Sequence, residues 1–212
     1  MLQGSDEWRQ ARCGSIGASD VPRVVRKINS GKAYSADRAS LMAEKLIERT
    51  TGKPYEKYKS AAMLQGTARE PEARLMYAIL KGLGLDEIEQ IGLVVHPKIA
   101  GAHASPDGLV GDKGLVEIKC PEPAAHLDTL DHETVSQDYY AQMSWQLGCT
   151  GRQWCDYCSY NPDYPTAMSI WIKRVNRDES YIRELEREVE RFIRELEAKI
   201  ERLTQRYGRL AA

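Results

Sequence analysis

Residues 103–121 constrain the fold of this chain more than any other segment. Within them, two apolar runs at 108–110 and 115–119 are separated by the turn-forming triplet 112–114. This spacing is typical of a β-hairpin with a three-residue loop, in which Gly114 adopts the left-handed conformation. Because an isolated hairpin is only marginally stable in water, the rest of the chain has to cover it with further strands or helices.

Charged side chains gather on one face of the predicted hairpin. In the register that this loop sets, Gly111 pairs with Leu115. Asp107 then lies opposite Lys119, and the two-residue period of a strand puts Glu117 on the same face. Two neighbouring acids repel each other, and a lysine together with a divalent cation would offset that repulsion. An exposed hairpin with a surface salt bridge is the alternative, but charged pairs are uncommon in so apolar a strand.

The two carboxylates suit a metal site of a particular kind. Hard oxygen ligands favour Mg²⁺ or Mn²⁺ over zinc. We therefore expect Asp107 and Glu117 to hold a divalent cation, and Lys119 to orient or deprotonate an attacking water. This arrangement indicates metal-assisted hydrolysis of a phosphodiester.

Hydrophobic periodicity over the rest of the chain predicts an α+β fold, with helices packed around a small mixed sheet. Helices are expected at 7–12, 18–28, 36–49, 57–80 and 137–147, the fourth of them interrupted near Gly66 and restarting at 69–71. Besides those of the hairpin, strands are expected at 88–96, 100–104, 153–160 and 167–173.

The last 30 residues predict a long amphipathic helix over 178–207. Its apolar residues recur at steps of three and four, at Ile182, Leu185, Val189, Phe192, Leu196, Ile200 and Leu203. A coiled-coil seam would need more regular heptads, so packing across its own domain is the favoured interpretation. We expect residues 1–212 to form a single domain, with a core at 5–175 followed by this helix.

Composition excludes several classes of protein. Hydrophobic residues make up 42% and charged residues 29% of the chain, which argues against disorder. No apolar run approaches the roughly 20 residues of a membrane span, and the first residues lack the pattern of a signal peptide. We therefore expect an intracellular protein.

Charge is unevenly distributed, although the net charge is only −1. Residues 1–60 contain 12 Lys and Arg against 7 Asp and Glu, whereas residues 61–212 contain 18 against 24. The basic third could bind phosphates. A solvated helix face explains part of the excess equally well, and its members would be Lys45, Arg49, Lys53 and Lys57.

The cysteines and histidines give weaker signals. Cys155 and Cys158 have the spacing of half a zinc site, which Cys149 and Cys13 could complete. The segment 153–160 alternates like a strand, however, so the first two thiols are expected to face opposite sides. The four histidines share no ligand spacing and are expected to be structural or surface residues: His96, His103, His126 and His132. The tryptophans could stack on bases, but core packing is the expected use of all four: Trp8, Trp145, Trp154 and Trp171.

Six short motifs occur in a fixed order: Trp8-x-x-x-Arg12, Gly17-Ala18-Ser19-Asp20, Gly66-x-x-x-Glu70-Pro71, Ser105-Pro106-Asp107-Gly108, Glu117-Ile118-Lys119 and Tyr139-Tyr140-x-Gln142-x-x-x-Gln146. Together they resemble the phage-type alkaline exonucleases, that is, the lambda exonuclease or YqaJ viral recombinase family of the PD-(D/E)XK superfamily. The resemblance covers residues 5 to about 175. It departs from the pattern at Gly17, where Thr is common in the family.

The resemblance implies a restriction-endonuclease-like core and assigns roles at its metal site. Asp107, Glu117 and the main-chain carbonyl of Ile118 would bind Mg²⁺, or Mn²⁺, with two ions expected. Lys119 would be the catalytic lysine. Glu70 would contribute to the second metal or its water.

The remaining motif residues have other implied roles. Gln142 would reach the region of the nucleophile. Arg12, Ser19 and Ser105 would form a pocket for the 5′-phosphate of the cleaved strand, and a guanidinium with two hydroxyls suits a phosphate.

The activity implied is that of a Mg²⁺-dependent 5′-to-3′ exonuclease. It would digest one strand of linear duplex DNA from 5′-phosphorylated ends, release 5′-mononucleotides and leave 3′ tails for phage-type recombination. The resemblance further implies a homotrimeric ring, a single-strand annealing protein as partner, and expression from a phage or prophage in the cytoplasm of a bacterial host.

Two alternatives stay open at this point. A restriction or repair endonuclease could use the same core, although it would not need a pocket for a terminal phosphate. A DNA-end-binding module with a decayed site is the second, although Asp107, Glu117 and Lys119 are all present.

Overall fold

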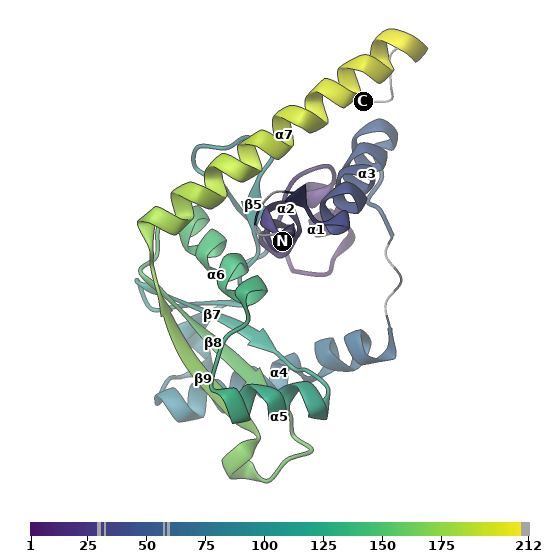
Figure 1. Cartoon of the computed structure of the whole chain (residues 1–212). Coiled ribbons are helices and arrows are strands. Elements are labelled where there is room, and N and C mark those ends of the chain that lie inside the picture. Colours follow the sequence, from purple (N-terminus) through teal and green to yellow (C-terminus); the bar gives the residue numbers. More distant parts are fainter. Residues whose placement is uncertain (29–30, 32, 57, 59, 209–212) are drawn as a thin grey trace.

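The structure is a computed structural model that describes residues 1–208 except 29, 30, 32, 57 and 59 (Figure 1). Its α-helices are α1 (Asp6–Arg12), α2 (Val21–Val25), α3 (Ala36–Thr51), α4 (Ala61–Lys81), α5 (Pro123–His132), α6 (Gln137–Thr150) and α7 (Glu179–Tyr207). Short 3-10 helices are η1 (Ala18–Asp20), η2 (Leu85–Glu87) and η3 (Thr166–Met168). No described helix is both long and apolar enough to cross a bilayer.

The central sheet has five strands in the order β3-β6-β7-β8-β9. Only the pair β7 and β8 is parallel, and the connection between these two strands carries α5 and α6. The strands are β3 (Ile88–Glu89), β6 (Gly108–Val110), β7 (Gly114–Lys119), β8 (Trp154–Tyr160) and β9 (Ile170–Asn176). Two small antiparallel pairs complete the fold: β1 (Lys27–Ile28) with β2 (Ala33–Tyr34), and β4 (Val94–Val95) with β5 (His103–Ala104). The predicted α+β class and small mixed sheet are confirmed.

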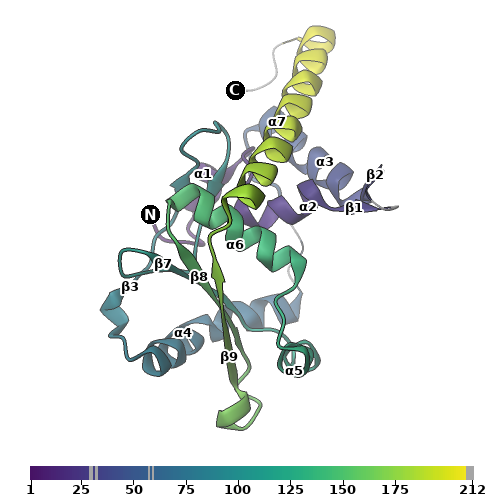
Figure 2. The ribbon, with the colours of Figure 1, turned by 60° about the vertical axis from the view of Figure 1, so that its left-hand side comes forward.

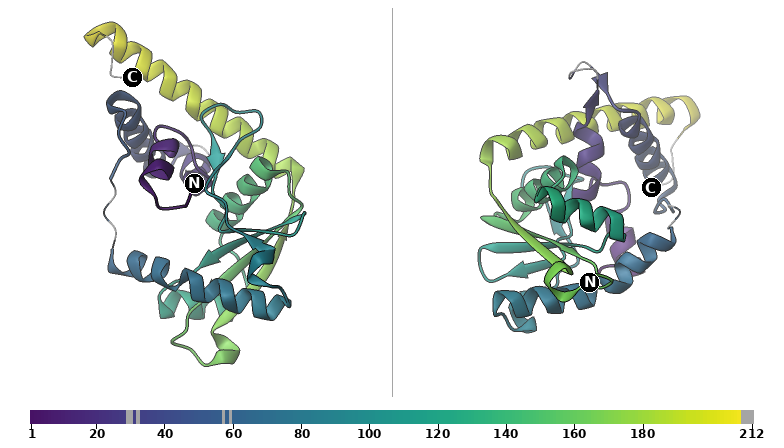
Figure 3. Two further views of the ribbon diagram at one scale, coloured as in Figure 1. Left: turned by 180° about the vertical axis from the view of Figure 1, so that it is seen from behind. Right: turned by 60° about the horizontal axis from the view of Figure 1, so that its bottom comes forward.

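Helices α4 and α6 cover opposite faces of the sheet (Figure 2). Ala73 and Tyr77 of α4 pack against Val116 and its neighbours on β7 and β8. Met143 and Leu147 of α6 pack on the other face. A third cluster joins α2, α3, α6 and the buried stripe of α7. Helices α2 and α3 lie beside α7, whereas α4 lies at the opposite end of the molecule from α7 (Figure 3).

The hairpin forms, but its predicted loop and register are wrong. The loop is 111–113, Val110 pairs with Gly114, and Gly111 is the left-handed glycine, with φ of 51°. A Cβ on Gly114 would lie 2.1 Å from the ring of Trp154, so this glycine is required for close packing, not for its backbone angle. Continued by one residue, the observed register places Asp107 opposite Glu117 rather than Lys119.

Helix α4 is continuous, contrary to the interruption predicted near Gly66. Gly66 brings the helix close to β7, because a Cβ there would lie 3.2 Å from the carbonyl oxygen of Cys120. Pro71 lies inside the helix on an exposed position. Thr67, whose carbonyl loses its helical partner, is an exposed residue too, so water can replace the missing hydrogen bond. The expected start at residue 57 lies outside the described residues, and the helix begins after its N-cap, Ser60.

Other boundaries differ in smaller ways. The predicted helix 18–28 ends at Val25, and Ile28 belongs to β1. The predicted strand 88–96 is divided into β3 and β4. The predicted C-terminal helix is confirmed as α7, which begins after Asp178 and buries its apolar stripe from Ile182 to Leu196.

Candidate active site

Glu117 lies at the centre of a set of side chains that β7 and α6 bring together. It is 1% exposed and faces α6. One carboxylate oxygen accepts hydrogen bonds from Lys119 Nζ and Gln142 Nε2, each 2.5 Å long. The other oxygen accepts from Gln146 Nε2, also at 2.5 Å. Since Gln142 and Gln146 are four residues apart, they project from one face of the helix.

Asp107 is attached to the same strand by its side chain. Its Oδ2 atom accepts a hydrogen bond of 2.7 Å from the main-chain N–H of Ile118, and Arg74 of α4 donates to its carbonyl oxygen at 3.1 Å. Burial and the nearby charge of Glu117 raise the pKa of Asp107 to about 8. The two carboxylates therefore disfavour each other's ionisation, and a cation between them would relieve this repulsion.

Lys119 supplies positive charge at the site. Burial by itself lowers the pKa of Lys119, but the charges of Glu117 and Asp107 outweigh this effect and leave the pKa raised. The ammonium group lies 5.2 Å from the centre of the Tyr139 ring. In this state of the site Lys119 is protonated and can orient a water molecule.

Glu70 approaches these groups from α4. Burial raises its pKa, and Lys119 and Arg74 act in the opposite direction. The structure thus brings four predicted residues into electrostatic contact: Glu70, Asp107, Glu117 and Lys119.

The oxygen atoms here have the chemistry of a site for a hard cation. Asp107 and Glu117 offer carboxylate oxygens, and Ile118 lies between Glu117 and Lys119 with its carbonyl at the same strand end. In the part of the chain that the structure describes, no three His, Cys, Asp or Glu side chains form a metal-binding group. The first of the two expected ions needs only two such side chains, so its donor chemistry fits Mg²⁺ or Mn²⁺.

Arg12 lies at the end of α1. Its Nε atom donates a hydrogen bond of 3.0 Å to Nε2 of His103, and its Cζ atom lies 4.0 Å from the centre of the Trp8 ring. Among the described residues, no group accepts a hydrogen bond from either Nη atom of Arg12. The guanidinium is therefore held at one edge while its fork stays unbonded.

Trp8 also connects Arg12 to Ser105. The indole N–H lies 3.2 Å from Ser105 Oγ and 2.7 Å from the carbonyl oxygen of Gly92. Trp8 is half-buried and packs against Arg12, not within the core as predicted. Ser19 is exposed in η1 and makes no described hydrogen bond to Arg12 or Ser105.

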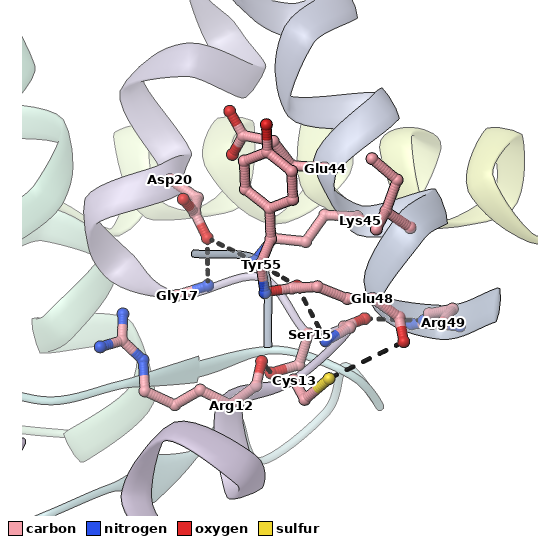
Figure 4. A network of polar contacts seen from close by, with 12 residues as sticks. Arg12, Cys13, Ser15, Gly17, Asp20, Glu44, Lys45, Glu48, Arg49 and Tyr55 are labelled. Carbon is pink, nitrogen blue, oxygen red and sulfur yellow. Dashed lines mark hydrogen bonds and ion pairs between the residues drawn. The ribbon is translucent and has the colours of Figure 1, made fainter. Parts of the chain in front are cut away.

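A buried network holds the loop that follows Arg12 (Figure 4). Glu48 of α3 accepts hydrogen bonds from Gly14 N at 2.9 Å, Lys45 Nζ at 3.0 Å and Tyr55 N at 3.0 Å. Lys45 also lies 3.2 Å from a carboxylate oxygen of Asp20. The prediction that Lys45 belongs to a solvated basic face is wrong, because the lysine is 8% exposed and paired with two acids.

Two further histidines have structural contacts. His126 is fully buried and bonds to Ser159 Oγ and to the carbonyl of Met168, both at 2.8 Å. His96 stacks on Trp145. The prediction that Cys155 and Cys158 face opposite sides of the sheet is confirmed, since each packs in a different core cluster.

Sequence reasoning missed two contributors to the site. Gln146 was within a recognised motif without a role, and its spacing from Gln142 is the signal that could have assigned one. His103, two residues before Ser105, contacts Arg12 through the fold alone.

Comparisons with known proteins give a matching family and similar structures. A family model described as the YqaJ-like viral recombinase domain matches residues 7–153. The crystal structure of an alkaline exonuclease, LHK-Exo from Laribacter hongkongensis, is similar at 43% sequence identity with a TM-score of 0.88, covering 98% of this chain and 100% of that chain. The structure of LHK-Exo in complex with dAMP has the same identity and coverage, with a TM-score of 0.89.

A more distant structure shares the fold alone. It is a phage related exonuclease from Haemophilus somnus 129PT, with 13% identity and a TM-score of 0.72, covering 89% of this chain and 96% of that chain. Among curated proteins, none matches the chain significantly.

Proposed function

Since this chain belongs to the family of YqaJ-like viral recombinase domains, we propose that it is a Mg²⁺-dependent exonuclease that acts on the ends of linear double-stranded DNA. The observation that carries this proposal is the arrangement of Asp107, Glu117 and Lys119, together with an arginine whose fork is unbonded among the described residues. The similarity to an alkaline exonuclease at 43% identity over nearly the whole chain supports it. All 212 residues would act as one nuclease domain.

The metal site would consist of oxygen donors. The carboxylates of Asp107 and Glu117 and the carbonyl of Ile118 would hold the first Mg²⁺, which Mn²⁺ could replace, and Glu70 would serve a second ion or its water. A bound divalent cation polarises the phosphodiester and lowers the pKa of water. Ca²⁺ should permit DNA binding without cleavage, because its looser coordination positions the water poorly.

The side chains around the metal have separate tasks in this proposal. Lys119 orients the attacking water and balances the charge of the two acids. Gln142 and Gln146 fix the orientation of the Glu117 carboxylate through their hydrogen bonds. A direct contact of Gln142 with the nucleophile stays a prediction.

Digestion would proceed from the 5′ end, because Arg12 and the hydroxyl groups near it are suited to a terminal phosphate. Arg12 and Ser105 would bind the 5′-phosphate, and Ser19 would reach it from η1. The complex of LHK-Exo with dAMP supports release of 5′-mononucleotides by this chain. The strand left behind would be a 3′ single-stranded tail, which an annealing protein would use in phage-type recombination in the cytoplasm of a bacterial host.

We also propose that three copies form a ring around the DNA. Helix α4 carries an exposed apolar stripe whose members recur at steps of three and four. A contiguous exposed apolar stripe suits a contact between proteins. The stripe consists of Leu64, Ala68, Pro71, Leu75 and Ile79. A threefold ring needs a heterologous contact, in which this stripe meets a different surface of the next subunit.

The test uses linear duplex DNA labelled at either end. In Mg²⁺, we expect 5′-phosphorylated duplex to be digested faster than 5′-hydroxyl duplex, and a closed circle to resist. Cleavage of the closed circle would instead support the alternative of a restriction or repair endonuclease. Binding of ends with no cleavage in Mg²⁺ or Mn²⁺ would support a DNA-end-binding module.

A further inference from the structure

Arg12 and His103 form a closed set of contacts. Arg12 Nε donates to His103 Nε2 at 3.0 Å, so in the neutral ring the proton lies on Nδ1. Nδ1 lies 2.8 Å from Ser15 Oγ, and this hydroxyl donates to the main-chain carbonyl of Arg12, also at 2.8 Å. One imidazole thus binds both the side chain and, through Ser15, the main chain of Arg12.

The imidazole is itself fixed by β5 and α6. His103 is 3% exposed, its main-chain N–H donates to the carbonyl of Ile16 at 2.9 Å, and its carbonyl accepts from Trp145 Nε1 at 3.0 Å. Burial and the charge of Arg12 lower the pKa of His103 to about 3. The ring therefore stays neutral at physiological pH, and Nε2 remains able to accept a hydrogen bond.

These contacts use only one of the five N–H groups of Arg12. The Trp8 ring covers the guanidinium at 4.0 Å, and no described residue accepts from the four N–H groups of the two Nη atoms. A partly buried guanidinium with an unbonded, oriented fork is suited to an anion with several oxygens.

Gly17 leaves the space that the pair occupies. A Cβ on Gly17 would lie 2.9 Å from His103 Nε2 and 3.1 Å from Arg12 Nη2. The backbone does not require glycine at this position, because φ is −88°. Figure 4 shows Gly17 beside the side chain of Arg12. The absence of a side chain at residue 17 is therefore a steric condition for the contact between Arg12 and His103.

We infer that His103 is a positioning residue, which holds Arg12 by Nε so that both Nη atoms face the 5′-phosphate of the DNA end. This inference rests on the proposed function and extends it. The preference for a phosphorylated end would be set by His103 and Gly17 as well as by the residues that contact the phosphate.

The test compares the dissociation constants of two duplex oligonucleotides that differ only in a 5′-phosphate or a 5′-hydroxyl. Fluorescence anisotropy in Ca²⁺ measures binding without cleavage. We expect His103→Leu to reduce the preference for phosphate by about tenfold, since an arginine that is not held loses charge-assisted hydrogen bonds. Binding of the hydroxyl duplex should change little.

Two further variants distinguish the loss of the hydrogen-bond acceptor of His103 from the loss of a buried ring. His103→Gln should retain part of the preference, because its side-chain oxygen can accept a hydrogen bond from Arg12. His126→Leu is the matched control, since it removes an equally buried histidine that makes no described contact with Arg12, and it should leave the preference unchanged. Thermal unfolding checks that each variant is folded.

Gly17→Ala provides an independent route to the same result. The added methyl group should displace the pair and reduce the preference as His103→Leu does. In the double variant Gly17→Ala/His103→Ala the methyl group has space, so the combined loss should be smaller than the sum of the two single losses.

The outcomes distinguish this inference from the proposed function. A preference that His103→Leu and Gly17→Ala both leave intact, while Arg12→Ala abolishes it, overturns the positioning role and leaves the phosphate pocket standing. If the unsubstituted protein shows no preference, or Arg12→Ala retains it, the pocket assignment is wrong and the role of His103 is overturned with it.

Discussion

At the scale of single residues, the two carboxylates of the site differ in how the protein satisfies them. Glu117 has hydrogen bonds to both oxygens and an ammonium group as partner. Asp107 has a described side-chain hydrogen bond only from Ile118 N, and its pKa is raised. A divalent cation would therefore contribute most of the charge balance that Asp107 lacks. The motif identified these acids from the sequence, but their unequal environments depend on α6 and could not be read from spacing.

The first prediction concerns the charged residues at the proposed metal site. Asp107→Ala, Glu117→Ala and Lys119→Ala should each lower the rate of cleavage by at least about a hundredfold, because each acts on the metal or the water. DNA binding and the circular dichroism spectrum should stay close to those of the unsubstituted protein. Near-normal turnover by any of the three would remove that residue from the mechanism.

The second prediction concerns the glutamines of α6. Gln146→Leu should reduce stability by about 1–3 kcal/mol, because it leaves a buried oxygen of Glu117 without its donor. Urea denaturation measures this change. Gln153→Leu, outside α6 and without a described side-chain hydrogen bond, is the control. Equal stability of the two variants would contradict the role of Gln146.

The third prediction concerns Arg12. Arg12→Ala should slow digestion of 5′-phosphorylated duplex far more than that of 5′-hydroxyl duplex, because only the phosphorylated end loses a charge-assisted contact. The initial rates on the two substrates provide the measurement. Equal losses on both would mean that Arg12 has a structural role or contacts the DNA backbone in general.

At the scale of elements, periodicity identified most helices and strands, whereas packing decided the details that it missed. The apolar stripe of α7 could be predicted from the sequence, because it alternates with charged residues over about eight turns. Helix α5 was missed because it buries only His126 and so shows no such stripe. The hairpin register was misjudged because Gly114 looks like a turn glycine, whereas its partner, Trp154, is 40 residues away in the sequence.

The fourth prediction follows from that hairpin. Gly114→Ala should destabilise the protein by about 2 kcal/mol or more, since its methyl group would overlap the Trp154 ring, which Arg174 covers at 3.5 Å. Gly111→Ala should cost only about 1 kcal/mol, because a Cβ there meets no atom and only the left-handed backbone resists it. Denaturant midpoints compare the two, and the reverse order would contradict the observed register.

At the scale of the whole molecule, the two proposed sites share one short segment. His103 holds Arg12, Ser105 contacts Trp8, and Asp107 belongs to the metal site, each two residues from the next. The protein would thus hold the 5′-phosphate of a DNA strand at a fixed distance from the phosphodiester bond that is cleaved. The sequence motif contains two of these residues, Ser105 and Asp107. Which side chains they contact is set by the fold and could not be predicted from the motif.

The fifth prediction concerns assembly. Light scattering should give about 72 kDa, three times the 24.0 kDa of one chain. Leu75→Glu/Ile79→Glu should yield monomers, because it places charges on the exposed stripe of α4. Ile47→Glu is the control, since Ile47 on α3 is as exposed as Leu75 but lies outside the stripe. A monomer at micromolar concentration for the unsubstituted protein would exclude the ring.

The proposed exonuclease activity is tested most directly with an internally labelled linear duplex that has one 5′-phosphorylated end. The duplex is incubated in Mg²⁺ with the unsubstituted protein or with Lys119→Ala. We expect the unsubstituted protein to release 5′-mononucleotides progressively from the phosphorylated end and to leave the complementary strand intact, and we expect Lys119→Ala to release none. Release from the 3′ end, internal cuts, or digestion by Lys119→Ala at the normal rate would contradict the proposal.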